Sequence, residues 1–226
     1  MDFLDWVRGP LLSFSILVFV LGLAWRLYSM WRLPASHEPV ASARRAFGTA
    51  AAMRAAFTRM VPSGGFHPSA TLVNLNPYVF HIGLLLVFLG YAPHIAFIRR
   101  LTGLSWPALP DMVMYLSAAA SMMSLLLALL FRLTDPVLKK ISTADDLITW
   151  ELTFLPFLTG MAVVGAPSAV LLAQRHVVYR GPLAVHLLAF ELLLLWFPFG
   201  KLMHAFWVLP ARMQLATFFG RRGVRS

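Results

Sequence analysis

Five long apolar stretches constrain this chain more than any other feature of its sequence. Crossing the hydrocarbon of a bilayer takes about 20 helical residues at about 1.5 Å of rise each. All five stretches reach that length, and charged residues make up only 12% of the chain, against about 25% in soluble domains. The sequence therefore predicts one all-α integral membrane domain over residues 1–226, with spans at about 10–31, 77–97, 112–131, 147–173 and 183–209.

The distribution of lysine and arginine predicts the orientation of these spans. With five spans the two ends of the chain lie on opposite sides, and most of the 19 basic residues share the side of the C-terminus. They are Arg26, Arg32, Arg44, Arg45, Arg54, Arg59, Arg132, Lys139, Lys140, Lys201, Arg212, Arg221, Arg222 and Arg225. The positive-inside rule then places the N-terminus outside and the C-terminus in the cytoplasm.

The formal charge of +10 could indicate nucleic acid, but the basic residues lie between apolar runs and form no basic domain of their own. We therefore expect them to face lipid headgroups and not nucleic acid. The alanine-rich segment 41–60 places Phe47, Met53, Phe57 and Met60 on one side and arginines elsewhere. Two interpretations stay open for it: a helix along the cytoplasmic membrane surface, or a docking site for a partner subunit.

The chain has no cysteine. This excludes disulfides, covalent c-type haem and any iron–sulfur cluster held by this chain. If electrons move through the protein, a partner has to deliver or remove them.

Four histidines lie in or at the ends of the predicted spans, where ionisable residues indicate function. His37, His67 and His176 fall in predicted loops. The second span runs outward and the fifth runs inward, so His81 faces His204 near the cytoplasm, and His94 faces His186 near the exterior. Neutral imidazole is a common ligand for iron and is buried without carrying a charge, so the two pairs predict two haem sites.

Helical phase supports these pairs unequally. His186 and His204 are 18 residues apart, which is five full turns at 3.6 residues each, so both imidazoles share a face of a continuous helix. His81 and His94 are 13 residues apart, a rotation of about 220° that points His94 away. Pro93 precedes His94, and proline kinks or unwinds a helix, so we expect an irregular turn there. The alternative is that His94 ends the helix at the membrane interface.

The sequences FHIGLLLVFLG around His81 and LAVHLLAFELLLLWFPFGKLMH from Leu183 to His204 resemble the gamma subunit of respiratory nitrate reductase. The likeness covers about residues 75–210 and includes TDPVLKKISTADD before the fourth span. It implies a five-helix cytochrome b of a prokaryotic cytoplasmic membrane that exchanges electrons with quinol. Two b haems are then expected, the inner one on His81 and His204 and the outer one on His94 and His186.

The sequence also departs from that family. Its members place the outer ligand of the second helix ten residues after the inner one, where this chain has Tyr91. A later histidine after proline, with LSWPALPD following and LPFLTG in the fourth span, is closer to a related branch. That branch serves sulfur-metabolising and heterodisulfide-reductase-like complexes. The resemblance therefore implies a cytoplasmic iron–sulfur partner that is heterodisulfide-reductase-like or nitrate-reductase-beta-like.

The sequence thus predicts a membrane conduit for electrons between a quinone pool and that partner. Asp111 and Glu191 are the acidic residues nearest the outer haem, and both are candidates for a proton relay in quinone chemistry. For Glu191, inside an apolar run, a structural hydrogen bond to a neighbouring helix is the alternative. Two other functions stay open for the chain: a haem-free membrane anchor, or a small transporter.

Overall fold

We describe the protein in a computed structural model, in which residues 2–33, 49–58, 68–164 and 180–221 are placed well enough to describe. Every regular element in these ranges is a helix. The elements are α1 (Phe3–Trp6), η1 (Val7–Leu11), α2 (Leu12–Trp31), α3 (Thr49–Thr58), α4 (Pro68–Gly90), α5 (Ala92–Thr102), α6 (Asp111–Thr134), α7 (Pro136–Ile141), α8 (Ala144–Val164), α10 (Arg180–Trp196), η2 (Lys201–Met203) and α11 (His204–Arg221). The prediction of an all-α chain is confirmed for this part of the sequence.

The helix of the first predicted span begins earlier than expected. Helices α1, η1 and α2 follow one another from Phe3 to Trp31, so Pro10 lies inside the helical run. Proline removes one backbone donor from the helical ladder. The turn around Pro10, Val7–Leu11, is accordingly a π-helix, in which hydrogen bonds reach one residue further.

The second predicted span consists of two helices. Helix α4 ends at Gly90, and Tyr91 is extended, with φ −80° and ψ 127°. Helix α5 then begins at Ala92 with Pro93 in its first turn, a position that proline favours because its missing N–H has no helical partner there. The irregular turn expected near Pro93 is therefore present. Gly103, with φ 79°, ends α5 in the left-handed conformation that glycine tolerates.

The prediction of a continuous fifth span over 183–209 is wrong. Helix α10 ends at Trp196, and the chain turns through Pro198 and Gly200 before η2 and α11. The segments Gly181–Trp196 and Lys201–Phe219 are bent by 77° from each other. Proline and glycine in the sequence FPFGK explain the break, because neither sustains a helical ladder. The five-turn argument for His186 and His204 therefore does not hold.

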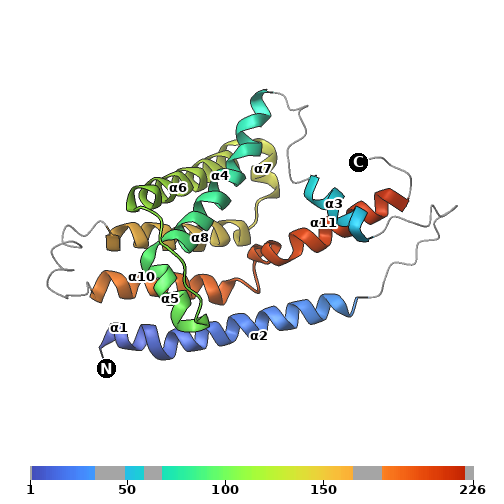
Figure 1. Ribbon diagram of the computed structural model, residues 1–226. Coiled ribbons are helices and arrows are strands. Elements are labelled where there is room, and N and C mark those ends of the chain that lie inside the picture. The colour runs from blue at the N-terminus through green and yellow to red at the C-terminus, as the bar shows by residue number, and fades with distance from the viewer. Residues whose placement is uncertain (1, 34–48, 59–67, 165–179, 222–226) are drawn as a thin grey trace.

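The helices pack in an order that differs from their order along the chain. Helix α10 packs between α2 and α8, and α6 packs between α8 and α4 (Figure 1). Phe80 of α4 also reaches Phe157 of α8. Helices α2 and α10 run in the same direction, since Val7 packs near Ala184 and Phe19 packs on Phe197. Gly83 allows α4 to approach α6 closely, because a Cβ there would lie 2.9 Å from the Ser117 carbonyl oxygen.

A second contact joins the 41–60 segment to the end of the chain. Its described part, α3, packs against α11 through a cluster of small residues, Ala52, Ala55 and Ala216 (Figure 1). Small side chains allow two helices to approach closely. Met53 and Phe57 of α3 are exposed, so this helix keeps an apolar surface beyond its contact with α11.

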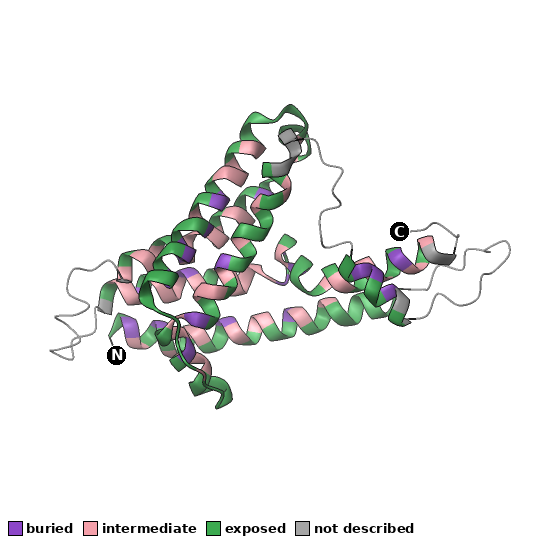
Figure 2. Cartoon of the chain, turned by 45° about the horizontal axis from the view of Figure 1, so that its top comes forward, coloured by how far each residue is buried: buried purple, intermediate pink, exposed green. Residues whose placement is uncertain are grey.

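Three of the described helical segments are long and apolar enough to cross a membrane: Phe3–Trp31, Leu72–Gly90 and Asp111–Thr134. The bent pair Gly181–Trp196 and Lys201–Phe219 adds a fourth if it is one span. Large apolar side chains such as Leu21 of α2, Leu116 of α6 and Met123 of α6 are exposed, and exposed positions run along most of the helix surfaces (Figure 2). A soluble protein rarely leaves so much apolar surface in water, whereas lipid covers it.

Candidate functional site

The structure brings His81 and His204 together. His81 lies in α4, and His204 is the first residue of α11, after the break that follows α10. Their ring centroids are 6.0 Å apart, with the ring planes at 87°. Both residues are exposed, so their rings remain accessible.

His94 and His186 form a second pair at the other end of α10. His94 lies in α5 and His186 in α10, and their ring centroids are 6.2 Å apart with planes at 18°. The ring of Tyr91 lies against His94 at 5.3 Å between centroids. His176, a predicted loop histidine that could take the place of His94 in this pair, lies outside the described residues.

In the His81–His204 pair, one ring nitrogen of each histidine is held by the backbone. His81 Nδ1 lies 2.5 Å from the Pro77 carbonyl oxygen, and His204 Nδ1 lies 2.9 Å from the Lys201 carbonyl oxygen. A carbonyl oxygen only accepts hydrogen bonds, so Nδ1 carries the proton in both rings. The Nε2 atoms of neutral rings are then unprotonated and ready to bind a metal.

The same tautomer follows for the His94–His186 pair. His94 Nδ1 lies 3.0 Å from the Val87 carbonyl oxygen, across the break between α4 and α5. His186 Nδ1 lies 3.1 Å from Thr159 Oγ1. The Thr159 hydroxyl donates to the Leu155 carbonyl oxygen at 2.7 Å, so its oxygen accepts from His186. Metal-binding histidines commonly hold their second ring nitrogen in this way, which fixes the tautomer and the ring orientation.

The ring separations match those of two imidazoles on one metal ion. A metal–nitrogen bond of about 2.0–2.1 Å, plus about 1.1 Å from the nitrogen to the ring centre, gives about 6.3 Å between two opposed rings. The measured values are 6.0 and 6.2 Å. Within the described ranges no three His, Cys, Asp or Glu side chains gather as they would around a bare metal ion. Two histidines would suffice only for a cofactor that brings further metal ligands of its own.

Gly160 positions His186 closely against α8. A Cβ at this position would lie 3.1 Å from Cε1 and 3.4 Å from Nδ1 of His186. The neighbouring Thr159 supplies the hydrogen bond to the same ring. Helix α8 therefore packs directly against the imidazole, and a side chain at position 160 would press on the ring.

A network of charges lies beside His204. The Asp146 carboxylate contacts Lys201 Nζ at 2.6 Å and Arg132 Nη1 at 3.1 Å, and it accepts hydrogen bonds from the Thr143 amide and hydroxyl at 2.9 and 3.0 Å. Burial alone would raise the pKa of Asp146, but these partners together lower it from 3.8 to about 2. Since the Lys201 carbonyl also receives the Nδ1 proton of His204, the network fixes the chain next to that histidine.

The two acidic candidates lie in different surroundings. Asp111 is exposed at the start of α6, and Leu109 just before it donates to the Gly90 carbonyl oxygen, so Asp111 lies at the same end as the His94–His186 pair. Glu191 is only 1% exposed, and neither carboxyl oxygen has a hydrogen-bond partner. A rotation of about 100° per residue places Glu191 about 140° away from the His186 face of α10.

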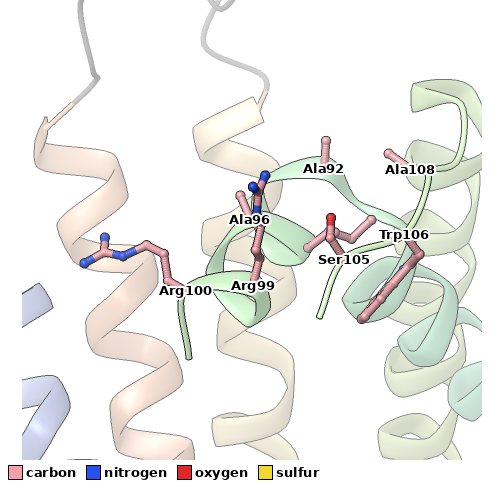
Figure 3. Close-up of a pocket in the computed structure, with 8 residues that line it drawn as sticks. Ala92, Ala96, Arg99, Arg100, Ser105, Trp106 and Ala108 are labelled. Carbon is pink, nitrogen blue, oxygen red and sulfur yellow. The ribbon is translucent and has the colours of Figure 1, made fainter. Parts of the chain in front are cut away.

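A hollow of about 560 Å³ lies between α5 and the chain that returns after Gly103 (Figure 3). Its wall on α5 consists of Ala92, Ile95, Ala96, Arg99 and Arg100. The return chain adds Ser105, Trp106 and Ala108 to the lining. Most of these α5 residues repeat every three to four positions and so share one face, and His94 projects from the opposite face.

Comparison with known proteins places the chain in a family without adding an activity. No family model matches it. A protein of Nitratidesulfovibrio vulgaris named only "Protein" is 30% identical over an alignment of 226 positions, which covers 96% of this chain and 94% of that protein. The chain belongs to the same family as that protein. Since its name states no function, the function of this family has to come from the geometry of the site.

Sequence reasoning missed several residues of the site. Thr159, Gly160 and Asp146 all come from α8, which carries none of the four histidines. A signal was present for Asp146, because Thr143 followed by two aspartates is typical of a helix start. Nothing in the sequence around Thr159 and Gly160 indicates which histidine they face, because that depends on how α8 packs on α10.

Proposed function

We propose that this chain is a membrane cytochrome b that carries electrons between the quinone pool and a cytoplasmic iron–sulfur subunit of a respiratory complex. The observation that carries the proposal is the geometry of the two histidine pairs. Each pair has the ring separation of opposed axial ligands, and in each ring Nδ1 is already hydrogen-bonded. His81 and His204 would hold the inner haem b, and His94 and His186 the outer one.

Haem held by two histidines performs one-electron transfer, because no coordination position remains for oxygen or a substrate. The chain itself supplies the fixed tautomers, the ring orientation and the apolar surroundings. The hydrogen bond from His186 to Thr159 and the packing of the ring against Gly160 keep His186 in place, and the break at Tyr91 turns His94 toward it. These contacts hold the ligands in position in both oxidation states, which keeps the reorganisation on electron transfer small.

Parallel packing of α2 and α10 supports five spans. Helix α2 ends on one side of the membrane, and α10, running the same way, begins on the opposite side. The chain between them therefore crosses an odd number of times. Helices α4 and α6 provide two crossings, and α8 provides the third. The positive-inside rule then gives an outer N-terminus and a cytoplasmic C-terminus.

With this orientation the His81–His204 pair lies at the cytoplasmic end, beside α11. The bend of 77° turns α11 away from α10, and α3 packs on it. The exposed apolar side chains Met53 and Phe57 of α3, together with the basic residues of this side, suit the docking of a cytoplasmic protein. Because the chain lacks cysteine, we propose a heterodisulfide-reductase-like or nitrate-reductase-beta-like iron–sulfur subunit at this surface.

The quinone would bind near the His94–His186 pair at the outer end. The hollow beside α5 offers an apolar wall together with the hydrogen-bond donors of Arg99 and Ser105 (Figure 3). It lies about one helix diameter, about 10 Å, from His94. Asp111 opens α6 at the same end and is exposed, so it is the acidic residue placed to pass protons between a quinol and the aqueous phase.

Haem content measured for single histidine variants tests the proposal. His81→Ala and His204→Ala should each remove the inner haem and leave most of the outer one, and His94→Ala and His186→Ala should do the reverse. The reduced-minus-oxidised spectrum and the haem per chain provide the readout. His67→Ala, a substitution in a predicted loop, is the matched control. A purified protein without a Soret band would instead identify the chain as a haem-free anchor.

The partner requires a separate test. Purification in mild detergent should retain an iron–sulfur subunit with the chain, and rapid mixing should show that this subunit exchanges electrons with the inner haem first. Removal of α11 after Val208 should release the subunit, because it removes the surface that α3 and α11 share. If the chain purifies alone, and no cytoplasmic iron–sulfur protein reduces or oxidises its haem, the conduit function is refuted.

A further inference from the structure

Two buried polar side chains without a hydrogen-bond partner lie in the interface between α2 and α10. Ser15 is 0% exposed and Glu191 is 1% exposed. Ser15 Oγ and both carboxyl oxygens of Glu191 have no hydrogen-bond partner in the part of the chain that the structure describes. Buried polar groups are nearly always hydrogen-bonded, so three such atoms in one interface call for an explanation.

The two residues face the same interface at the same level. Ser15 shares a helical face with Phe19, Gly22 and Arg26, whose contacts are with Phe197 and Pro198 at the end of α10. Ala184, Leu187 and Leu188 pack against Leu4 and Val7, and Glu191 follows them on the same face of α10. Position 7 thus lies opposite 184 and position 19 opposite 197, which places Ser15 opposite residues 192–193, within one helical turn of Glu191.

Within the described residues, Glu191 forms no ion pair with the neighbouring helices. On α10 itself, His186 points about 140° away. Helix α8 runs antiparallel, with Thr159 at His186 and Thr149 at Trp196, so apolar residues near Phe154 lie at the level of Glu191. The nearest titratable or charged groups from the packed elements are Asp5 and Arg8, which pair with each other at 3.4 Å, Arg26 at the far end of α2, and Glu151, which is exposed on α8.

We propose that Glu191 and Ser15 form a buried proton-binding site that is coupled to the oxidation state of the outer haem. An isolated carboxylate is costly in an apolar interior, whereas a neutral carboxylic acid with a hydroxyl beside it is tolerated. The protonated fraction of Glu191 rises when one electron reaches the His94–His186 site, with protons drawn from the aqueous phase, and it falls again when the electron leaves. This proton uptake offsets part of the added negative charge.

Distance makes this coupling strong enough to matter. Glu191 lies five residues beyond His186, about 7.5 Å along the helix axis. At a separation of about 10–12 Å and an effective dielectric constant of about 20, one added electron changes the proton affinity of Glu191 by about tenfold. Ser15 Oγ and the Glu191 carboxyl oxygens are not hydrogen-bonded to each other in the structure, so the proposed site requires a change of side-chain rotamer. After that change the hydroxyl accepts from the protonated carboxyl group or donates to the deprotonated one. The inference rests on the proposed haem function.

Infrared difference spectroscopy of the purified haem-loaded protein tests the proposal. Reduction should produce a positive band in the carbonyl-stretch region of protonated carboxylic acids. Glu191→Gln, which keeps the shape of the side chain, should abolish this band, and Ser15→Ala should shift its frequency. Glu151→Gln, on the exposed surface of α8, is the matched control and should leave the band in place. A band that persists in Glu191→Gln, or no band in the wild type, would overturn the proposal.

Potentiometry provides the second readout. The midpoint potential of the outer haem should fall as the pH rises through the titration of Glu191, by a total of about 59 mV, which is the tenfold change in affinity expressed for a one-electron couple. Glu191→Gln should flatten that dependence and leave the inner haem unchanged. The haem content of each sample distinguishes failure of this proton-binding site from failure of the proposed haem function. Full haem with no proton-linked change refutes this site alone, whereas missing haem refutes the proposed function as well.

Discussion

Replacing Asp146 with asparagine should destabilise the end of the bundle that holds His204. The Asp146 side chain is 7% exposed and joins Arg132 of α6 to Lys201 of η2. Asparagine keeps the size of the side chain and part of its hydrogen bonding to Thr143, but it removes the negative charge. Two cations from different elements then lose their shared partner, and Lys201, whose carbonyl oxygen holds His204 Nδ1, is less firmly placed.

The magnitude follows from the pKa of Asp146. Its change from 3.8 to about 2 corresponds to roughly 2–3 kcal/mol at about 1.4 kcal/mol per pKa unit. Because Lys201 is 49% exposed and water solvates it after the substitution, we reduce this value to about 2 kcal/mol. At about 2–4 °C per kcal/mol for a chain of this size, the melting temperature should fall by about 4–8 °C.

The pH dependence has a definite sign. A carboxyl group whose pKa is lowered by folding stabilises the protein above its unfolded pKa, and this contribution is lost as the pH falls through the folded pKa. The difference in stability between wild type and Asp146→Asn should therefore be constant above about pH 5 and disappear between about pH 4 and pH 2. Asp145→Asn is the matched control. It removes the neighbouring carboxylate, which accepts a hydrogen bond from Thr149 and has no ion pair in the described part of the chain.

Thermal unfolding of the detergent-solubilised protein across this pH range measures the effect, with the haem content of each sample recorded in parallel. We expect Asp146→Asn to lose inner haem at a lower temperature than outer haem, and Asp145→Asn to match the wild type. If Asp146→Asn has the same melting temperature as the wild type at neutral pH, or if the difference in melting temperature does not change as the pH falls, then the network does not stabilise this end of the bundle.

Two further substitutions act on the His94–His186 pair. Gly160→Val should displace the His186 ring, since even a Cβ would lie 3.1 Å from it, and the outer haem should be lost while the inner haem remains. Gly160→Ala should lose less of the outer haem. Full outer haem in the valine variant would contradict the packing described. Thr159→Val keeps the volume but removes the acceptor for His186 Nδ1, so outer haem affinity should fall by about 10–100-fold in haem titrations. Thr153→Val on the same helix is its control.

Sequence reasoning located helices well because membrane spans follow from apolar length. The third stretch, predicted at 112–131, is α6 at Asp111–Thr134. The 41–60 segment is helical in its described part, Thr49–Thr58. The fourth stretch was predicted at 147–173, and its part beyond Val164 lies outside the described residues. Prolines predicted the ends of helices less well. Pro93 marks a real break, whereas Pro77, Pro156 and Pro210 lie inside helices.

The histidine pairs show what the sequence could and could not provide. Depth along each span identified which histidines lie opposite each other, because depth depends only on residue number and direction. Rotation about each helix was less predictable. The predicted phase placed His186 and His204 on one continuous helix, but Pro198 and Gly200 interrupt it, and His204 reaches His81 from a new helix. Long-range contacts such as Thr159 with His186 depend on packing and leave no local signal.

Each histidine pair joins the second hydrophobic segment of the chain to the last one. During synthesis, His81 and His94 enter the membrane long before His186 and His204, which belong to α10 and α11. Neither pair exists until α10 has been inserted, and the His81–His204 pair also requires α11 to have emerged. A cofactor that needs both histidines of a pair therefore binds only a completed chain. If the pairs hold a cofactor, the order of the helices allows it to bind only after the last helices have been inserted. A chain truncated before Arg180 has neither histidine pair.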